Sequence, residues 1–543
     1  MKLKFPVIAA LAASALLYSC VSVDNSLGEN YLATNMKYDL YTAEFNIDDI
    51  ELRQPDSLSS YSSYRFSIGA VRDADFGLTT RSAAFTLVPA FDNLDFGKPG
   101  TQVFRNFHLT AVNDSISTCD PKQANILQNV SVYALLKPLD KNSSKPEIEH
   151  GSVSIAKASP VLNGSDSLSI DFTEAFGKEY LTITKEELDS LPLYEQRFPG
   201  IFLTCDAPHG EGGRINMFKL PLAVSSGSIT GSYATLTFSA EYEGRGQVDT
   251  TFLFYLGPVK KYDLSEISST SVSEYPQVAY NLTTHSSEGL EGPASDVVYF
   301  EGGNGLKPVV KAAGIREKVL DIISEHGDPA KAIINKATVV MPYDFPEDYL
   351  EMSHFPKYLS PTCRIVNKDE SITFAGITDA SISSENHGDI NRSLCVYSPD
   401  ITHHVQQLLK LEDMSKIENY DIWFLALADE TTTTTTSGNN DMSEYYQQMA
   451  YANYYNSMYG GYGGYGYGGY GGYGGYGGYG GYGSAYSNYY NYMMMAQMMN
   501  SSTTQTQTQQ MMDFIRFYRA KLRGPAAADG PKIKITYSIE RSE

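Results

Sequence analysis

Short segments in which apolar and polar residues alternate run through most of this 543-residue chain. Such alternation places every second side chain on one face of a β-strand, whereas a helix needs an apolar repeat near 3.6 residues. Clusters of Gly, Asp, Asn and Ser, the residues of tight turns, separate the segments. The pattern predicts a mostly β protein, with strands at 63–71, 81–88, 130–136, 200–205, 215–220, 234–242, 250–256, 296–301, 333–341, 421–428 and 532–540.

The chain is longer than one hydrophobic core normally serves, so we expect two β-sandwich-like domains with a few short helices. The N-terminal β-rich domain is predicted to span 36–258, and a polar, serine-rich linker to span 259–293. The C-terminal β-rich domain is predicted to combine 294–428 with 512–543. The helical repeat appears only briefly, at 314–324 and 401–410.

Residues 429–511 change in character, to a low-complexity run rich in Thr, Tyr, Gly and Met with repeated Tyr-Gly-Gly. It has almost no aliphatic residues for a core, so we expect a long disordered insertion. Because an alternating strand returns at 532–540, the run is an insertion within the second domain rather than a tail. Three roles stay open: a solvated spacer, an adhesive surface of tyrosines, or a tether that docks a protein partner.

The first residues predict where the protein works. Lys2 and Lys4 precede an apolar run at 5–17, and Leu17 stands three residues before Cys20, as in a lipobox. The run is shorter than the ~20 residues of a transmembrane helix. We therefore expect a lipoprotein signal peptide at 1–19, a lipid on Cys20 and a tether at 20–35. The alternative is an ordinary secretory signal with an incidental cysteine.

This reading places the protein at the outer membrane, lipid-anchored, on the cell surface rather than on the periplasmic face. The formal net charge is -22, and removal of Lys2 and Lys4 makes it -22 - 2 = -24. Such a charge repels nucleic acid and anionic headgroups, so we expect no nucleic-acid partner. Attachment to the membrane must then come from the lipid and not from a basic patch.

Four cysteines remain after Cys20, and they are far apart in sequence without a Cys-x-x-Cys pair. The pattern favours free or buried thiols; a disulfide between Cys363 and Cys395 is the alternative. No metal ligand set is expected. The adjacent His403 and His404 would point ~100° apart on a helix, so they cannot share one ion and are expected at the surface or at a helix end.

Several short motifs occur in a characteristic order, and together they resemble the Bacteroidota lipoprotein family called domain of unknown function 4270. The motifs are DADFG at 73–77, FPGIF at 198–202 leading to GGRI at 212–215, EGGNGLK at 301–307, DIT at 400–402 and the segment 531–537. The FPGIF and GGRI segments together are similar to a central hairpin of that family. The resemblance implies an outer-membrane lipoprotein of β-rich fold, and it assigns no activity.

The glycine-rich EGGNGLK invites comparison with a phosphate-binding loop. It lacks the Gly-Lys-Ser/Thr ending and does not open a helix, so a β-turn or bulge is the better interpretation. In that case Gly302, Gly303 and Gly305 would supply backbone conformations with positive φ.

Five Asp-Ser/Thr-apolar tripeptides look like the acceptor sequence for O-glycosylation in exported Bacteroidota proteins. The alternative is a set of Asx-type turns that carry no glycan. The candidate acceptors are Ser57, Ser115, Ser167, Ser190 and Thr250.

No catalytic motif such as Gly-x-Ser-x-Gly or His-Glu-x-x-His is present, and we expect neither an enzyme nor a cofactor. The favoured function is a non-enzymatic binding or structural component of a cell-envelope assembly, with an outer-membrane protein as partner. One alternative is a surface lipoprotein that binds carbohydrate. Another is a glycan-active hydrolase, which would need two carboxylates facing each other ~5–9.5 Å apart.

Overall fold

The computed structural model describes residues 38–541 except 57, 59–60, 90–93, 115–125, 141–142, 144, 222, 226–227, 258–276, 287–289, 368–371, 382–384 and 436–503. The predicted signal peptide, Cys20 and the predicted tether lie outside these residues, as does most of the predicted insertion. Strands dominate the described chain, which confirms the predicted mostly β fold of two sandwich-like parts with a few short helices. None of its helices is both long and apolar enough to cross a membrane.

The N-terminal unit is a sandwich of a nine-stranded and a five-stranded sheet, both antiparallel. The larger sheet contains β3 (Tyr61–Ser62), β4 (Arg65–Asp73), β5 (Gly77–Phe85), β8 (Gln128–Leu135), β9 (His150–Ser154), β10 (Val161–Leu162), β12 (Ile201–Cys205), β13 (Gly212–Lys219) and β18 (Ala279–His285). The smaller contains β6 (Leu87–Pro89), β7 (Val103–Val112), β11 (Ser167–Asp171), β16 (Tyr233–Tyr242) and β17 (Gly246–Leu256). The remaining elements are α2 (Glu174–Tyr180), α3 (Lys185–Leu188), α4 (Leu191–Arg197) and the hairpin of β14 (Ala223–Ser225) and β15 (Ser228–Thr230).

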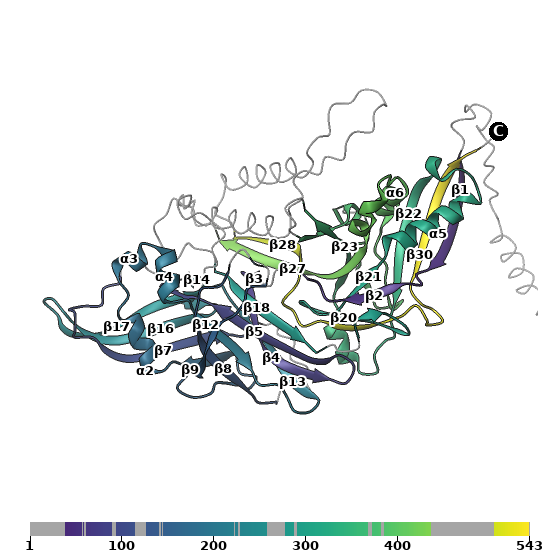
Figure 1. The fold of residues 1–543 in the computed structure, drawn as a ribbon. Helices are drawn as coiled ribbons and strands as arrows, with labels where there is room; N and C mark the ends of the chain where they lie inside the picture. Colours follow the sequence, from purple (N-terminus) through teal and green to yellow (C-terminus); the bar gives the residue numbers. More distant parts are fainter. Residues whose placement is uncertain are drawn as a thin grey trace, which may run out of the picture.

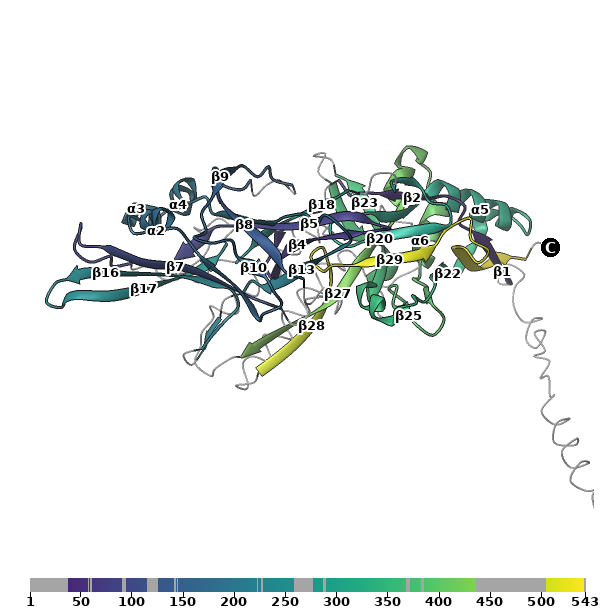
Figure 2. The same ribbon diagram turned by 90° about the horizontal axis from the view of Figure 1, so that it is seen from below.

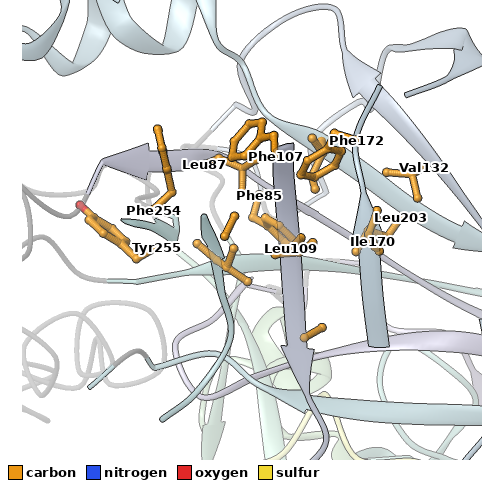
Figure 3. Close-up of a cluster of buried hydrophobic side chains, with 14 of the residues drawn as sticks. Phe85, Leu87, Phe107, Leu109, Val132, Ile170, Phe172, Leu203, Phe254 and Tyr255 are labelled. Carbon is orange, nitrogen blue, oxygen red and sulfur yellow. The ribbon is translucent and has the colours of Figure 1, made fainter. Parts of the chain in front are cut away.

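Apolar residues of the two sheets fill the space between them (Figure 3). Phe85 of β5 and Leu203 of β12 face Leu109 of β7 and Phe254 of β17, and all four are fully buried. Phe107 lies among Phe172, Tyr180 and other rings of this core. Burial of large side chains on this scale is the main force that holds a sandwich together.

The C-terminal unit surrounds a second core. One sheet has the order β1 (Tyr38–Asn46), β30 (Lys532–Glu540), β22 (Ile333–Pro342), β26 (Val396–Tyr397) and β25 (Ile390–Asn391). Another has the order β19 (Gly292–Pro293), β2 (Ile50–Arg53), β21 (Lys307–Val310), β27 (Ile422–Thr435), β23 (Tyr358–Val366) and β24 (Ile372–Gly376), with β28 (Thr504–Met512) paired to β27. The strands β20 (Val297–Glu301) and β29 (Arg519–Arg523) pair with each other. The helices are α5 (Ala312–Ser324), α6 (Thr402–Leu409) and the 3₁₀ turns η5 (Pro329–Lys331), η6 (Tyr349–His354), η7 (Thr378–Ser381) and η8 (Met414–Tyr420).

The predicted closing strand is confirmed as β30, at the expected bounds. Its alternate residues Ile533, Ile535, Tyr537 and Ile539 are buried in the second core. On one side β30 pairs with β22, and on the other with β1, where Tyr38 lies opposite Glu540.

Two predicted domain boundaries are wrong. Strands β1 and β2 were expected in the N-terminal domain, yet they pair with β30 and β21 of the C-terminal unit. The predicted linker contains β18, which pairs with β5 and β3 in the larger N-terminal sheet. In both cases the partner strand is far away in sequence, so no local signal reveals the pairing.

The expected central hairpin at 198–215 is also wrong. Strand β12 pairs with β5 and β8, whereas β13 pairs with β4. Both predicted helices are confirmed as α5 and α6. The DIT segment fixes α6 to β22, because Thr402 accepts a hydrogen bond from the backbone N–H of Ala337 and Gln406 accepts one from Ile334.

The molecule is elongated, with the two units side by side (Figures 1 and 2). The β16–β17 hairpin forms the tip of the N-terminal unit. Strand β1 and the C-terminal end of β30 lie at the opposite tip. The described chain therefore begins and ends at the same tip of the molecule.

We expect a chain that begins at residue 54 to lose the folded C-terminal unit, because β30 and β21 would each lose a partner strand and expose apolar surface. A chain that begins at residue 38 should keep it. Thermal unfolding followed by circular dichroism, together with limited proteolysis, checks this. Equal stability of the two chains would contradict the assignment of β1 and β2 to this unit.

Candidate functional site

The site that stands out is the junction between the two units, at the base of a two-stranded ribbon. Strand β27 is buried from Ile422 to Ala426 and again at Ala428, and it then continues away from the core, paired with β28. The pairing runs from Leu427 opposite Met512 to Thr435 opposite Thr504. Thr435 and Thr504, the described residues on either side of 436–503, thus lie opposite each other on neighbouring strands of one ribbon (Figure 2).

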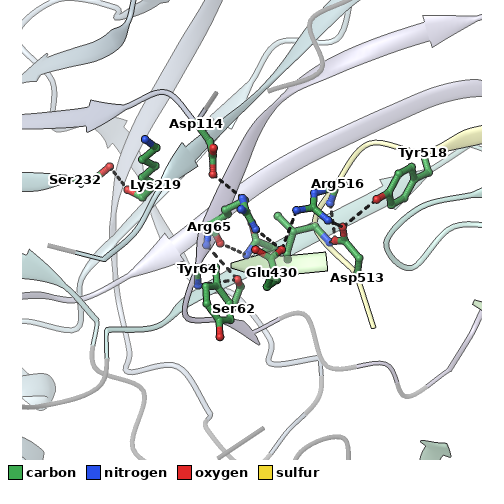
Figure 4. A network of polar contacts seen from close by, with 12 residues as sticks. Ser62, Tyr64, Arg65, Asp114, Lys219, Ser232, Glu430, Asp513, Arg516 and Tyr518 are labelled. Atoms are coloured by element: carbon green, nitrogen blue, oxygen red, sulfur yellow. Dashed lines mark hydrogen bonds and ion pairs between the residues drawn. The ribbon is translucent and has the colours of Figure 1, made fainter. Parts of the chain in front are cut away.

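Glu430, on β27 at the base of this ribbon, joins the two units through a network of ion pairs (Figure 4). Its Oε1 accepts hydrogen bonds from Arg65 Nη1 of β4 at 2.5 Å and from Arg516 Nη2 at 3.0 Å. Arg65 Nε also donates to Asp114 at 2.6 Å, and Arg516 pairs with Asp513 at 3.1 Å. Each of the five side chains is at most 14% exposed, so water screens these ion pairs only weakly.

The network keeps its arginines charged despite burial. Burial alone would lower the pKa of Arg65, but the hydrogen bond to Glu430 raises it above the usual value. Burial likewise opposes the charge of Arg516, and the nearby Asp513 carboxylate outweighs it and raises the pKa. The two arginines therefore act as fixed positive charges and are unsuited to exchanging protons at neutral pH.

A second polar cluster lies in the same junction, around Glu301 at the end of β20. Its carboxylate contacts His285 Nδ1 at 3.0 Å and Thr79 Oγ1 at 3.4 Å. Thr79 also accepts a hydrogen bond from Arg519 Nη2 at 2.8 Å, and Arg519 pairs with Asp73 at 3.2 Å. Burial opposes ionisation of Glu301, yet the hydrogen bond from His285 lowers the pKa of the carboxyl below its ordinary value.

The EGGNGLK segment is the turn between β20 and β21, so the prediction of a turn rather than a phosphate loop is confirmed. Of its three glycines Gly303 has a positive φ, +60°, whereas Gly302 and Gly305 do not. A Cβ on Gly303 would lie 2.6 Å from the guanidinium of Arg81, and one on Gly305 would lie 2.8 Å from His285 Nε2. The glycines therefore let this turn close against two buried side chains of the N-terminal unit.

Two further cations complete the cluster. Arg81 donates to Thr283 Oγ1 at 2.6 Å and to the carbonyl of Phe514 at 3.3 Å. The ammonium of Lys307 donates to the backbone carbonyls of Glu301 and Gly305. Burial lowers the pKa of Lys307 to about 7 and that of Arg81 to about 10, because neither charge is fully compensated by a carboxylate contact.

A hollow of about 30 Å³ lies beside Arg65, Glu430 and Met512, which is the space of about one water molecule. Within the described residues, no group of three or more His, Cys, Asp or Glu side chains is arranged to hold a metal ion. The arrangement can rigidly join two β units and the base of a ribbon.

The predicted glycosylation acceptors are scattered. Ser57 and Ser115 lie outside the described residues, like the predicted lipidation site Cys20. Ser167 begins β11, Ser190 precedes α4 as its N-cap residue, and Thr250 in β17 bonds Tyr242 through its hydroxyl at 2.9 Å. Glycosylation stays a prediction at all five.

The disulfide alternative is not realised, since Cys363 and Cys395 are both free thiols. Cys363 is buried in β23 with its sulfur 4.0 Å from His404 Nδ1, and Cys395 contacts the carbonyl of Arg392 at 3.6 Å. Cys363 thus lies in a strand, whereas Cys395 lies in the turn before β26, and the two thiols have different partners. His403 and His404 were expected at the surface or at a helix end, and both lie in the first turn of α6. His404 is nevertheless buried there, and burial lowers its pKa to about 4.

Sequence reasoning missed the junction itself. Arg65 and Glu430 are 365 residues apart, and neither belongs to a recognisable motif. The sequence did contain two motifs whose residues lie in the junction. They are the glycine-rich turn at 301–307 and the DADFG turn at 73–77. Asp73 of that turn and Thr79 just beyond it contact Arg519, and Thr79 also contacts Glu301 of the glycine-rich segment, so residues in or beside two of the motifs lie in this junction.

Comparisons of the whole chain were made with protein families, with characterised proteins and with solved structures. None of the three finds a match. The resemblance to the domain of unknown function 4270 family therefore stays a prediction.

We expect Glu430→Gln to lower the free energy of unfolding by roughly 2–4 kcal/mol, since it leaves two buried guanidinium groups facing a neutral amide. Urea denaturation measures the change. Glu241→Gln, at an exposed residue 3.9 Å from Lys98, is the matched control and should change stability by less than about 0.5 kcal/mol. Equal effects of the two substitutions would show that the network contributes nothing beyond surface charge.

The low pKa of Lys307 predicts a pH dependence of stability. The unfolded chain holds this proton up to about pH 10.5, whereas the folded chain releases it near pH 7. Burial of the charged amine therefore costs folding energy below pH 7, and this cost is relieved as the pH rises from 7 to 10.5. We expect the stability of the wild type relative to Lys307→Met to increase over this range, as measured by urea denaturation. Parallel curves would contradict the assignment.

Proposed function

We propose that this protein is a non-enzymatic binding or structural component of a cell-envelope assembly, anchored at the outer membrane by a lipid on Cys20. The lipobox and the order of family-like motifs support the location. The cell surface is the proposed face. The protein partner is proposed to be another component of the outer membrane.

The observation that carries the proposal is the ribbon. Residues 436–503 connect Thr435 to Thr504, which lie opposite each other on the ribbon. The base of the ribbon is joined to both units by the buried network at Glu430. A segment held in this way can reach a partner while the body serves as a fixed support.

The composition of the segment agrees with a role in contact. In 436–503 the charged residues are Asp441 and Glu444, although the chain as a whole carries -22. Tyrosine recurs through the Tyr-Gly-Gly repeats, and tyrosine supplies large contact area together with a hydroxyl for hydrogen bonding. Many weak contacts on one chain add to useful avidity. The near absence of charge also removes the repulsion that the acidic body would exert on another acidic protein.

The test is affinity purification from detergent-solubilised outer membranes, with the captured proteins identified by mass spectrometry. We expect the wild-type protein to retain a stoichiometric outer-membrane partner. Replacing 436–503 by Asn-Gly should release it, because this dipeptide closes the ribbon as a two-residue hairpin and leaves the body intact. Changing the repeat tyrosines at 459–482 to serine, at unchanged length, should release it as well.

Two results would contradict the proposal. One is absence of the protein from the outer-membrane fraction. The other is recovery of the wild-type protein without a partner. Retention of the partner by both variants would instead indicate that the partner contacts the body and not residues 436–503.

A further inference from the structure

A cleft of about 800 Å³ opens on the C-terminal unit beside β29. Its walls are β29, the start of β20 and the segment 344–355 that follows β22. Figure 2 shows β20 and β29 side by side at this place. The volume lies within the ~300–1,000 Å³ of ordinary ligand sites, whereas the hollow at the ribbon base holds about one water.

The rim of the cleft is acidic. Five carboxylates and two cations line it, so the lining carries an excess of three negative charges. The cations are already matched: Arg523 donates to Asp344 at 2.6 and 2.9 Å, and Lys521 pairs with Asp75 of the N-terminal unit at 2.7 Å. The excess comes from the other carboxylates, among them Glu347 and Glu351. An anionic ligand would be repelled from this rim.

The floor of the cleft is apolar. Val297, Leu522 and Phe355 contribute to it, and Leu522 is fully buried. At the rim Phe345 is 51% exposed, an unusual position for a phenylalanine. An aromatic face beside carboxylates attracts a lysine or arginine side chain through two interactions, a cation–π contact with the ring and an ion pair with a carboxylate. The apolar floor accepts the aliphatic stem of the same side chain.

We propose that this cleft binds a lysine- or arginine-bearing segment of a protein partner. Charge complementarity and the exposed ring select a basic segment over an acidic one, and the volume admits more than one residue. The inference rests on the proposed function in taking the partner to be a protein. It adds a second contact, on the body, to the one proposed for residues 436–503.

The test uses the full-length protein purified in detergent and a fluorescent Lys-Arg-Lys-Arg peptide, with binding followed by anisotropy at about 0.15 M salt. We expect Glu347→Gln/Glu351→Gln to weaken binding about fivefold. Glu211→Gln/Glu243→Gln removes the same charge at two exposed residues of the N-terminal unit and should weaken it less than about twofold. Phe345→Ala should weaken binding about threefold at unchanged net charge. Circular dichroism confirms that each variant is folded.

Equal weakening by the two double variants would overturn the proposal, because it would reduce the effect to general charge. Absence of peptide binding would also overturn it. So would binding or cleavage of a neutral oligosaccharide in place of the peptide, since the glycan-hydrolase alternative would use the same carboxylates. These outcomes do not depend on the purification from outer membranes, so a failure here is distinguishable from a failure of the proposed assembly.

Discussion

Charges removed from water must be compensated, and the junction between the two units is organised by this requirement. Glu430 serves two arginines that come from different units, and Glu301 lies between His285 and Thr79. Neither cluster is complete until both units and the segment after β28 are in place. A polar interface of this kind specifies one arrangement of the units, since any other would leave buried charges without partners.

The same requirement explains why the family-like motifs carry no visible chemistry. Asp73 of the turn at 73–77 pairs with Arg519 in the junction, and the glycines of the turn at 301–307 make room for Arg81 and His285. The DIT segment hydrogen-bonds the backbone of β22. These residues build the frame. Binding is proposed for parts of the chain that no motif marks: the segment beyond the ribbon and the cleft beside β29.

Much of the fold could be predicted, because its signals are local. The alternation at 532–540 specified β30 and its buried face, and the 3.6-residue repeat specified α5. Pairing over long distances could not be predicted. Strand β1 has no strong apolar run, and its assignment depends on a partner that follows some 490 residues later in the sequence. The cleft could not be predicted either, because it combines three segments that are separate in sequence. The charged residues of these segments do not stand out in an acidic chain.

The pairing of β1 with β30 has a consequence for the order of folding. The strands β3 to β18 of the N-terminal unit come from one continuous stretch of chain, so that unit can form as soon as its last strand has been synthesised. In the C-terminal unit β1 cannot pair until β30, the last strand of the chain, has been synthesised. Contacts between residues so far apart in sequence form slowly. During that interval β1 and β2 present unpaired edges, which are open to wrong partners. Folding of the C-terminal unit therefore requires synthesis of β30. A chain truncated before β30 would have a folded N-terminal unit and an incompletely folded C-terminal unit.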